Sequence, residues 1–205
     1  MSLWPEIVMI VAAYLLGSIP FGYIFTRKYT GKSILGLGSG NIGSTNVRRI
    51  AGKKAAVYTQ ICDMLKGLLP VALVYILRIK DLYPFDEFFI YLVALATIIG
   101  HDFSVFLLFK GGKGVNTTLG ASLLLAPYSV CASVVIYFAI KWKVKIVSIA
   151  SIFLAITLTV TNLLIHKKSY LAYYLLIASG LIVIRHIPNI RRIINGTETR
   201  LPPAS

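Results

Sequence analysis

Two glycine-rich segments combine hydrogen-bond donors and cations in a pattern that suits an anionic ligand. The longer one runs from Gly36 to Arg49 and reads GLGSGNIGSTNVRR. Its glycines permit turns with positive φ, and successive N–H groups in such turns form a cradle for an anion. Arg48 and Arg49 add guanidinium groups, which bind two phosphate oxygens at once. A flexible basic loop without a ligand is the alternative. We expect ligand contacts from Gly38, Ser39, Gly40, Asn41, Thr45, Asn46 and Arg49.

The shorter segment is Lys110-Gly111-Gly112-Lys113-Gly114. Its glycines expose backbone N–H groups, and the helix expected after it points the positive end of its dipole at the loop. We expect Lys113, Gly111, Gly112 and Gly114 to bind the same kind of anion. The segment is not a nucleotide-binding P-loop, because Leu107 stands where glycine is needed and Gly114 follows the lysine. A Lys-Gly turn that anchors lipid headgroups is the alternative.

A third polar segment, 185–192, begins where the last apolar tract ends and reads RHIPNIRR. His186 and Asn189 are three residues apart, so one helical turn puts both on the same face unless Pro188 reshapes it. A basic flank that only stops membrane insertion is the alternative. Near the start of the apolar tract Ile146–Ile165, Ser151 is a further donor, or simply a packing serine.

Polar residues within the apolar tracts need partners, because an unpaired charge in hydrocarbon is costly. Asp63 and Lys66 are three residues apart, which predicts an ion pair, and we expect His101 to hydrogen-bond inside the bundle. Any further role of these three residues is left open. The sequence shows no Asp/Glu/His/Cys cluster with metal-ligand spacing and no nucleophile paired with a base, so we expect neither a metal nor a cofactor.

The elements that must position these residues are membrane helices. The chain has 205 residues, of which 57% are hydrophobic and 14% charged, and its mean hydropathy is +0.79. Soluble domains are about 45–50% apolar and about 25% charged, so the composition excludes an ordinary water-soluble enzyme. The formal net charge is nevertheless +14. Membrane orientation, contact with anionic lipid and an anionic substrate are the three explanations that we consider.

Six apolar tracts are long enough to be considered as spans. The fourth holds Pro127 near its middle, so it is either one tilted span or two short helices that turn at the proline. The tracts are Ile7–Phe25, Ala55–Leu77, Phe88–Phe109, Val115–Ile140, Ile146–Ile165 and Tyr170–Ile184.

The distribution of cations decides between the two topologies. Two short helices put 16 of the 21 cations on one side and four on the other, whereas a single span divides the loop cations 11 to 9. Cytoplasmic loops are enriched in Lys and Arg, so the first topology is favoured. We therefore predict an all-α integral membrane protein with seven transmembrane helices, the fourth and fifth short. Its N-terminus is outside and its C-terminus cytoplasmic. The four outer cations are Arg78, Lys80, Lys167 and Lys168.

This topology puts all three polar segments on the cytoplasmic face, within one polytopic domain (1–198) followed by a flexible tail (199–205). Donors and cations at the membrane edge suit an enzyme that joins a phosphate-bearing substrate to a lipidic one. A membrane transporter of an organic phosphate is the main alternative, although it needs a path to the outer face. A scaffold that recruits anionic lipid is a weaker one.

The three segments resemble the signatures of the bacterial acyl-phosphate:glycerol-3-phosphate acyltransferases, the PlsY family. The first resembles the pattern G-S-G-N-x-G-A-T-N-V-x-R, and 100–115 resembles the second signature. Two smaller departures stand out, since Ser44 and Asn116 occupy positions where alanine is usual or common. The resemblance spans about Leu16 to Glu198. Its remaining matches are Asp63, Lys66, Gly67, His186, Asn189, Arg192, Gly196 and Glu198.

The resemblance implies transfer of a fatty acyl group from acyl phosphate to the 1-hydroxyl of glycerol 3-phosphate, giving lysophosphatidate and phosphate. This is the first acylation of phospholipid synthesis, in the bacterial cytoplasmic (inner) membrane, with a site that faces the cytoplasm. The partners implied are these two substrates and the lipid bilayer, without nucleic acid or an obligate protein partner. The proton acceptor is either His186 or the acyl phosphate itself. The residues implied at the phosphate site are Ser39, Arg49, Lys113, Ser151, His186 and Asn189.

Overall fold

The computed structural model describes residues 4–166 and 169–200, and throughout these residues the chain forms α-helices and short 3₁₀ helices without strands. Lys167 and Lys168 of the expected outer loop, and 201–205 of the expected tail, lie outside the described residues. The chain divides into two compact units, Met1–Leu124 and Leu125–Ser205, each of which is described by itself. The expectation of an all-α chain with several apolar helices is confirmed.

Within its described residues, unit 1 contains five α-helices and two 3₁₀ helices. The 3₁₀ helices, η1 (Ile34–Gly36) and η2 (Val105–Leu107), lie in the two longest connections. The α-helices are α1 (Trp4–Ser18), α2 (Phe21–Thr30), α3 (Ser44–Ile79), α4 (Glu87–Asp102) and α5 (Val115–Ser122).

The first expected span, Ile7–Phe25, is broken into α1 and α2. Pro20 causes the break, because it lacks a backbone N–H and disfavours helical geometry at Ile19. Irregular backbone at membrane depth is tolerated only where other groups satisfy the freed carbonyls. Here the Ser104 hydroxyl donates to the Ser18 carbonyl, and the Lys66 ammonium donates to the Ile19 carbonyl over 2.8 Å.

The helix of the second expected span begins well before the apolar tract Ala55–Leu77, because α3 already starts at Ser44. Thr45, Asn46 and Arg49 therefore lie in the first turns of a helix. Gly52, with φ +85° and ψ 178°, interrupts the helical geometry before the helix resumes toward the apolar part of α3. The break is possible because glycine adopts this conformation without a side-chain clash.

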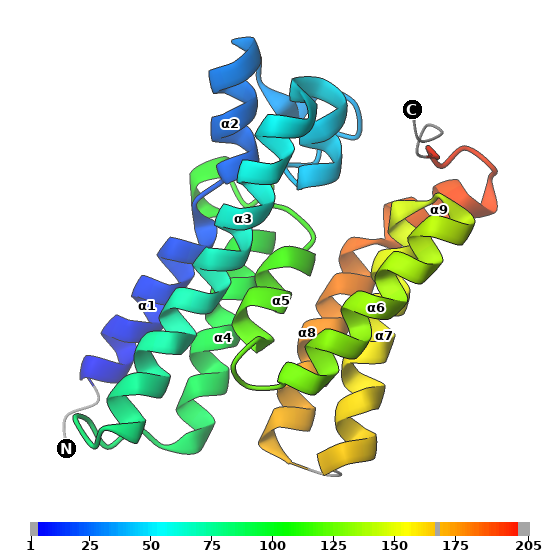
Figure 1. Cartoon of the computed structure of the whole chain (residues 1–205). Helices are drawn as coiled ribbons and strands as arrows, with labels where there is room; N and C mark the ends of the chain where they lie inside the picture. Colours follow the sequence, from blue (N-terminus) through cyan, green and yellow to red (C-terminus); the bar gives the residue numbers. More distant parts are fainter. Residues whose placement is uncertain (1–3, 167–168, 201–205) are drawn as a thin grey trace. The chain divides into compact units, whose positions relative to one another are not determined.

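Helices of unit 1 approach one another closely where glycine removes the side chain. A Cβ atom at Gly100 of α4 would overlap the Tyr14 carbonyl oxygen of α1, and one at Gly120 of α5 would overlap the Met64 carbonyl oxygen of α3. Small residues at such crossings are typical of membrane helix pairs. Figure 1 shows α1, α3 and α4 side by side in this unit, with α2 beside the start of α3.

The fourth apolar tract is broken as expected, since α5 ends at Ser122 and α6 (Pro127–Val144) begins at the proline. The fourth expected span, which corresponds to α5, is short, with 8 residues. The expectation that the fifth span is also short is wrong, because the corresponding helix α6 has 18 residues and continues past Ile140 through Lys141 and Lys143. Cations at a helix C-terminus interact favourably with its dipole, which explains the extension.

Unit 2 contains α6, α7 (Val147–His166), α8 (Tyr170–Arg185) and α9 (Ile187–Ile194). Helices α6 and α8 both pack against α7 (Figure 1). Large apolar side chains remain on the outside of these helices; Val135 is 67% exposed and Leu164 is 80% exposed. Such faces are expected where lipid replaces water as the solvent.

Four helical segments of the described chain are long and apolar enough to cross a membrane, and a fifth is added if α8 and α9 form one bent span. One of the four, Trp4–Thr30, comprises α1 and α2 together. The structure therefore supports an integral membrane protein with several apolar helices. Seven crossings, and the sides on which the termini lie, stay predictions from the sequence.

Candidate active site

The glycine-rich segment of unit 1 rests on a small apolar core. Ile34, Ile42 and Val47 are at most 1% exposed, and they pack with Ala55 and Ala56 of α3. Burial of such side chains stabilises a fold by about 1.5–3 kcal/mol each. The segment between η1 and α3 is irregular, but packing against this core holds its backbone in place.

The buried side chain of Asn46 holds the same segment together through three hydrogen bonds. The Asn46 amide donates to the Leu37 carbonyl (3.0 Å) and to the Asn41 carbonyl (2.9 Å), and its oxygen accepts from the Ser39 N–H (3.1 Å). Gly38 and Gly40 take φ values of +57° and +68°, so the predicted turns with positive φ are confirmed.

These hydrogen bonds divide the predicted ligand contacts into two groups. Asn46 has donated both of its amide hydrogens, and the Asn41 oxygen accepts from the Gly43 N–H (2.8 Å), so both residues organise the loop. Ser39 and Arg49 are exposed at its surface. Within the described residues, the side chain of Arg49 makes no hydrogen bond or ion pair, so its guanidinium group is available to a ligand.

The two glycine-rich segments meet where two helices begin. The Asn116 amide of α5 donates to the Ser44 hydroxyl of α3 over 3.4 Å. The N-cap residue of each helix is a glycine, at Gly43 and Gly114, so neither N-cap supplies a side-chain oxygen. The first N–H groups of a helix have no intrahelical partner, and together with the dipole they attract anions. Two such ends and Lys113, which precedes Gly114, form a candidate anion site.

This contact joins the two residues by which the sequence departs from the family signatures. Neither Ser44 nor Asn116 could be assigned a role from the sequence, because their hydrogen bond spans 72 positions of the chain. With alanine at either position this bond cannot form. Unit 1 thus brings the first and second predicted segments together.

In unit 2, the third segment forms a bend. Helices α8 and α9 meet at an angle of 50°, and His186 and Asn189 are buried there, with 3% and 5% exposure. The His186 Nδ1 lies 2.7 Å from the Ile182 carbonyl oxygen. A carbonyl oxygen only accepts, so Nδ1 carries the hydrogen and Nε2 is the ring nitrogen that can take a proton.

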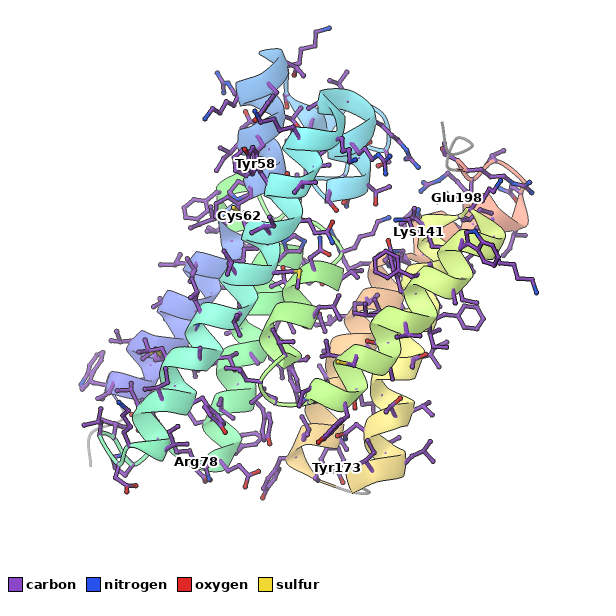
Figure 2. All side chains as sticks on the ribbon, in the orientation of Figure 1. Tyr58, Cys62, Arg78, Lys141, Tyr173 and Glu198 are labelled. Atoms are coloured by element: carbon purple, nitrogen blue, oxygen red, sulfur yellow. The ribbon has the colours of Figure 1, made fainter. Side chains whose placement is uncertain are left out.

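The bend is held by Glu198, whose central position the sequence does not reveal. Its carboxylate accepts from Asn189 (2.7 Å), from Ser148 (2.9 Å) and from the Arg192 guanidinium (2.7 Å). Burial acts to raise the pKa of Glu198, but these hydrogen bonds outweigh it and hold the pKa below its usual value. Figure 2 shows Glu198 beyond α9, at the same end of unit 2 as Lys141 of α6.

Ser151 lies on α7 of the same unit and is 4% exposed. Its hydroxyl donates to the Val147 carbonyl one turn earlier (3.0 Å). This is the usual arrangement for a serine that packs within a membrane helix. A contact with a ligand would need this hydroxyl to rotate, or to accept a hydrogen bond instead.

Comparison with known proteins gives consistent matches over nearly the whole chain. The family model described as "Glycerol-3-phosphate acyltransferase" matches residues 7–196. A glycerol-3-phosphate acyltransferase of Clostridium acetobutylicum is 42% identical over 193 residues, which cover 94% of this chain and 98% of that relative. The enzyme of the same description from Geotalea daltonii is also 42% identical, over 94% of this chain and 96% of its own length.

Two solved structures share the fold. Both are crystal structures of PlsY, described as an integral membrane glycerol 3-phosphate acyltransferase, one in a glycerol 3-phosphate form and one in a lysophosphatidic acid form. Each is 33% identical to this chain, and the match covers 97% of this chain and 96% of the other. The TM-scores are 0.87 and 0.84.

The first prediction concerns the amide of Asn46. Asn46→Asp keeps the size of the side chain but removes both donated hydrogen bonds and leaves a carboxylate against two carbonyl oxygens. We expect a fall in melting temperature of about 5 °C, since each lost bond costs about 1 kcal/mol. We also expect added inorganic phosphate to raise the melting temperature of Asn46→Asp by less than that of the wild type. Asn195→Asp, an exposed asparagine, is the control. Unchanged melting and phosphate response in Asn46→Asp would contradict this role.

The second prediction concerns the pH dependence of unit 2. Because the pKa of Glu198 is lowered in the folded protein, its contribution is complete above the ordinary carboxyl value of 4.5 and is lost as the pH falls further. Glu198→Gln should therefore melt below the wild type at neutral pH, and the gap should narrow under acidic conditions. Thermal unfolding across pH tests this, with exposed Asp81→Asn as the control. A gap that is independent of pH would count against the ionic network.

Proposed function

Because the chain belongs to the glycerol-3-phosphate acyltransferase family and is an acyltransferase of the PlsY type, we propose a donor, a product and a set of residues for its reaction. The donor is an acyl phosphate and the acceptor is the 1-hydroxyl of glycerol 3-phosphate. The products are 1-acyl-glycerol 3-phosphate and inorganic phosphate. The glycerol 3-phosphate and lysophosphatidic acid forms of the related crystal structures support the acceptor and the product.

The observation that carries this proposal is the pair of helix starts in unit 1. The beginnings of α3 and α5 are linked by Asn116 and Ser44, and each follows an N-cap glycine, which has no side-chain oxygen of its own. Lys113 lies beside one and Arg49 is exposed near the other. A doubly charged phosphate needs several donors and cations at once. We assign glycerol 3-phosphate binding to Lys113 with the Gly111–Gly114 loop, and phosphate contacts to Ser39 and Arg49.

The chemistry requires little more than such an arrangement. The hydroxyl oxygen attacks the acyl carbonyl carbon, the bond from that carbon to the phosphate oxygen breaks, and the hydroxyl proton leaves with the phosphate. An acyl phosphate is already activated, so no covalent enzyme intermediate is needed. Holding two anions close together supplies the orientation, and N–H groups and cations stabilise the oxyanion and the departing phosphate.

Two acceptors compete for the proton, and we propose that the acyl phosphate accepts it. The carboxylate that lies nearest to the third segment, Glu198, already accepts from Ser148, Asn189 and Arg192, so it is poorly placed to act as a base. The rival is Nε2 of His186, because Nδ1 donates to the Ile182 carbonyl. In this account His186 and Asn189 contact phosphate, and Ser151 supplies a further hydroxyl.

We further propose that the reaction takes place at the cytoplasmic face of the bacterial inner membrane. The support is the asymmetry of charge, since the three polar segments lie with 16 of the 21 cations in the favoured topology. A charged, water-soluble acceptor can then reach the site from the aqueous phase, while the acyl product stays in the lipid. The transporter alternative has less support, because the family is one of enzymes.

The third prediction tests the phosphate ligands. Arg49→Ala and Lys113→Ala should each lower kcat/KM for glycerol 3-phosphate by roughly 10- to 100-fold, because a charged hydrogen bond contributes about 1.5–3 kcal/mol. The assay is transfer from acyl phosphate to labelled glycerol 3-phosphate by purified protein. Matched controls are Arg78→Ala and Lys80→Ala, exposed cations at the C-terminal end of α3, where Figure 2 labels Arg78. Equal losses in the controls would contradict the assignment.

The fourth prediction separates the two proton acceptors. A general base contributes typically 10²- to 10⁴-fold in rate. If the substrate takes the proton, His186→Gln should raise KM yet keep kcat at saturating substrates within about tenfold of the wild type. A kcat loss beyond 100-fold, with both substrates still bound, would instead identify His186 as the base. Rate measurements across pH complete the test. If the acyl phosphate accepts the proton, the pH profile of the rate in His186→Gln should follow the substrate phosphate alone.

A further inference from the structure

A buried polar cluster lies where α1, α3 and α4 of unit 1 meet, and the proposed reaction does not use it. The Lys66 ammonium lies 3.0 Å from the Asp63 carboxylate, which confirms the predicted ion pair. The His101 Nδ1 is 3.6 Å from the same carboxylate oxygen. All three residues are at most 4% exposed. Charged groups at such depth are costly and usually have a purpose beyond packing.

The cluster is fixed on one side by the break between α1 and α2. Lys66 donates to the Ile19 carbonyl beside the break at Pro20, and its ammonium lies 5.7 Å from the centre of the Phe21 ring. The ion pair is therefore held by backbone and by an aromatic face, in addition to its own attraction. Such a network allows little movement of Asp63.

On the other side the cluster supports the loop that carries Lys113. The Gly112 N–H donates to the His101 carbonyl over 2.9 Å. A Cβ atom at Gly112 would overlap the His101 Nε2, and one at Gly111 would overlap the His101 carbonyl oxygen. The absence of side chains at these positions thus lets the loop lie directly against the end of α4. Gly112 packs against one edge of the imidazole while Asp63 faces the other.

We propose that His101 is a positioning residue for glycerol 3-phosphate binding: its ring, oriented by Asp63 and Lys66, fixes Gly112 and thereby the place of Lys113. The inference rests on the proposed role of Lys113. In this proposal Gly111 and Gly112 do more than offer N–H groups. Because they lack side chains, the loop can pack against the buried imidazole of His101. His101 contacts no substrate in this account, so its effect is exerted through the loop alone.

The fifth prediction follows from the contact between position 112 and the ring. Gly112→Ala should raise KM for glycerol 3-phosphate at least tenfold, because the methyl group pushes the loop off His101. His101→Asn retains a donor toward Asp63 but removes the edge of the ring, so alone it should raise this KM by less. The double variant should recover most of what Gly112→Ala loses, because the shorter side chain leaves room for the methyl group.

The readouts exclude a merely structural effect. The KM for acyl phosphate and the melting temperature are measured beside the KM for glycerol 3-phosphate, and only the last should follow the double-mutant cycle. Gly180→Ala is the matched control, since a Cβ atom there meets nothing within 4 Å. If Gly112→Ala does not fold, recovery of folded, active protein in the double variant is the equivalent result. Additive losses, or parallel shifts in all readouts, would overturn the inference.

Lys113→Ala in the same assay distinguishes a failure of the proposed role of Lys113 from a failure of the positioning role of His101. If it leaves the KM for glycerol 3-phosphate unchanged, the proposed role of Lys113 fails, and the positioning role fails with it. If Lys113→Ala raises this KM but His101→Asn does not relieve Gly112→Ala, the proposed function stands and the positioning role of His101 is overturned.

Discussion

A backbone group without a hydrogen-bond partner costs several kcal/mol in hydrocarbon, and this constraint decides where the chain is helical and what holds it where it is not. Two irregular stretches of unit 1 are held by buried polar side chains. Lys66 and Ser104 donate to carbonyls at the break beside Pro20, and Asn46 holds the glycine-rich segment together. Glu198 holds the bend of unit 2 in a different way, by accepting hydrogen bonds from three side chains. Two of these residues, Asn46 and Glu198, thus also shape the segments that carry candidate ligand contacts.

The net charge of +14 has two origins that the structure helps to separate. Most cations orient the helices in the membrane, as their uneven distribution between loops indicates. A small subset lies near helix starts whose N-cap residue is glycine, where orientation alone does not require cations. Arg49 and Lys113 belong to this subset. For a reaction between two phosphate-bearing molecules, these few cations and the neighbouring N–H groups are the chemical equipment that the proposed mechanism needs.

Much of the fold follows from the sequence, because apolar length and charge are local properties. The break at Pro127 and the ion pair between Asp63 and Lys66 were predictable from a proline and from a spacing of three. The break at Pro20 was not, because its tolerance depends on Lys66, 47 positions away from Ile19. The helix start at Ser44, the three bonds of Asn46 and the central place of Glu198 depend in the same way on partners that only the folded chain brings near. The motifs therefore indicated which ligand to expect, while the supporting residues emerged only from the structure.

The central claim is that two held anions and an activated donor suffice for acyl transfer. The most direct measurement gives the purified protein labelled glycerol 3-phosphate with either an acyl phosphate or an acyl thioester of equal chain length, and follows lysophosphatidate and inorganic phosphate together. The account predicts ester formation with acyl phosphate only, with one phosphate released for each ester formed. Turnover with the thioester at a comparable rate, or ester formation without phosphate release, would contradict it.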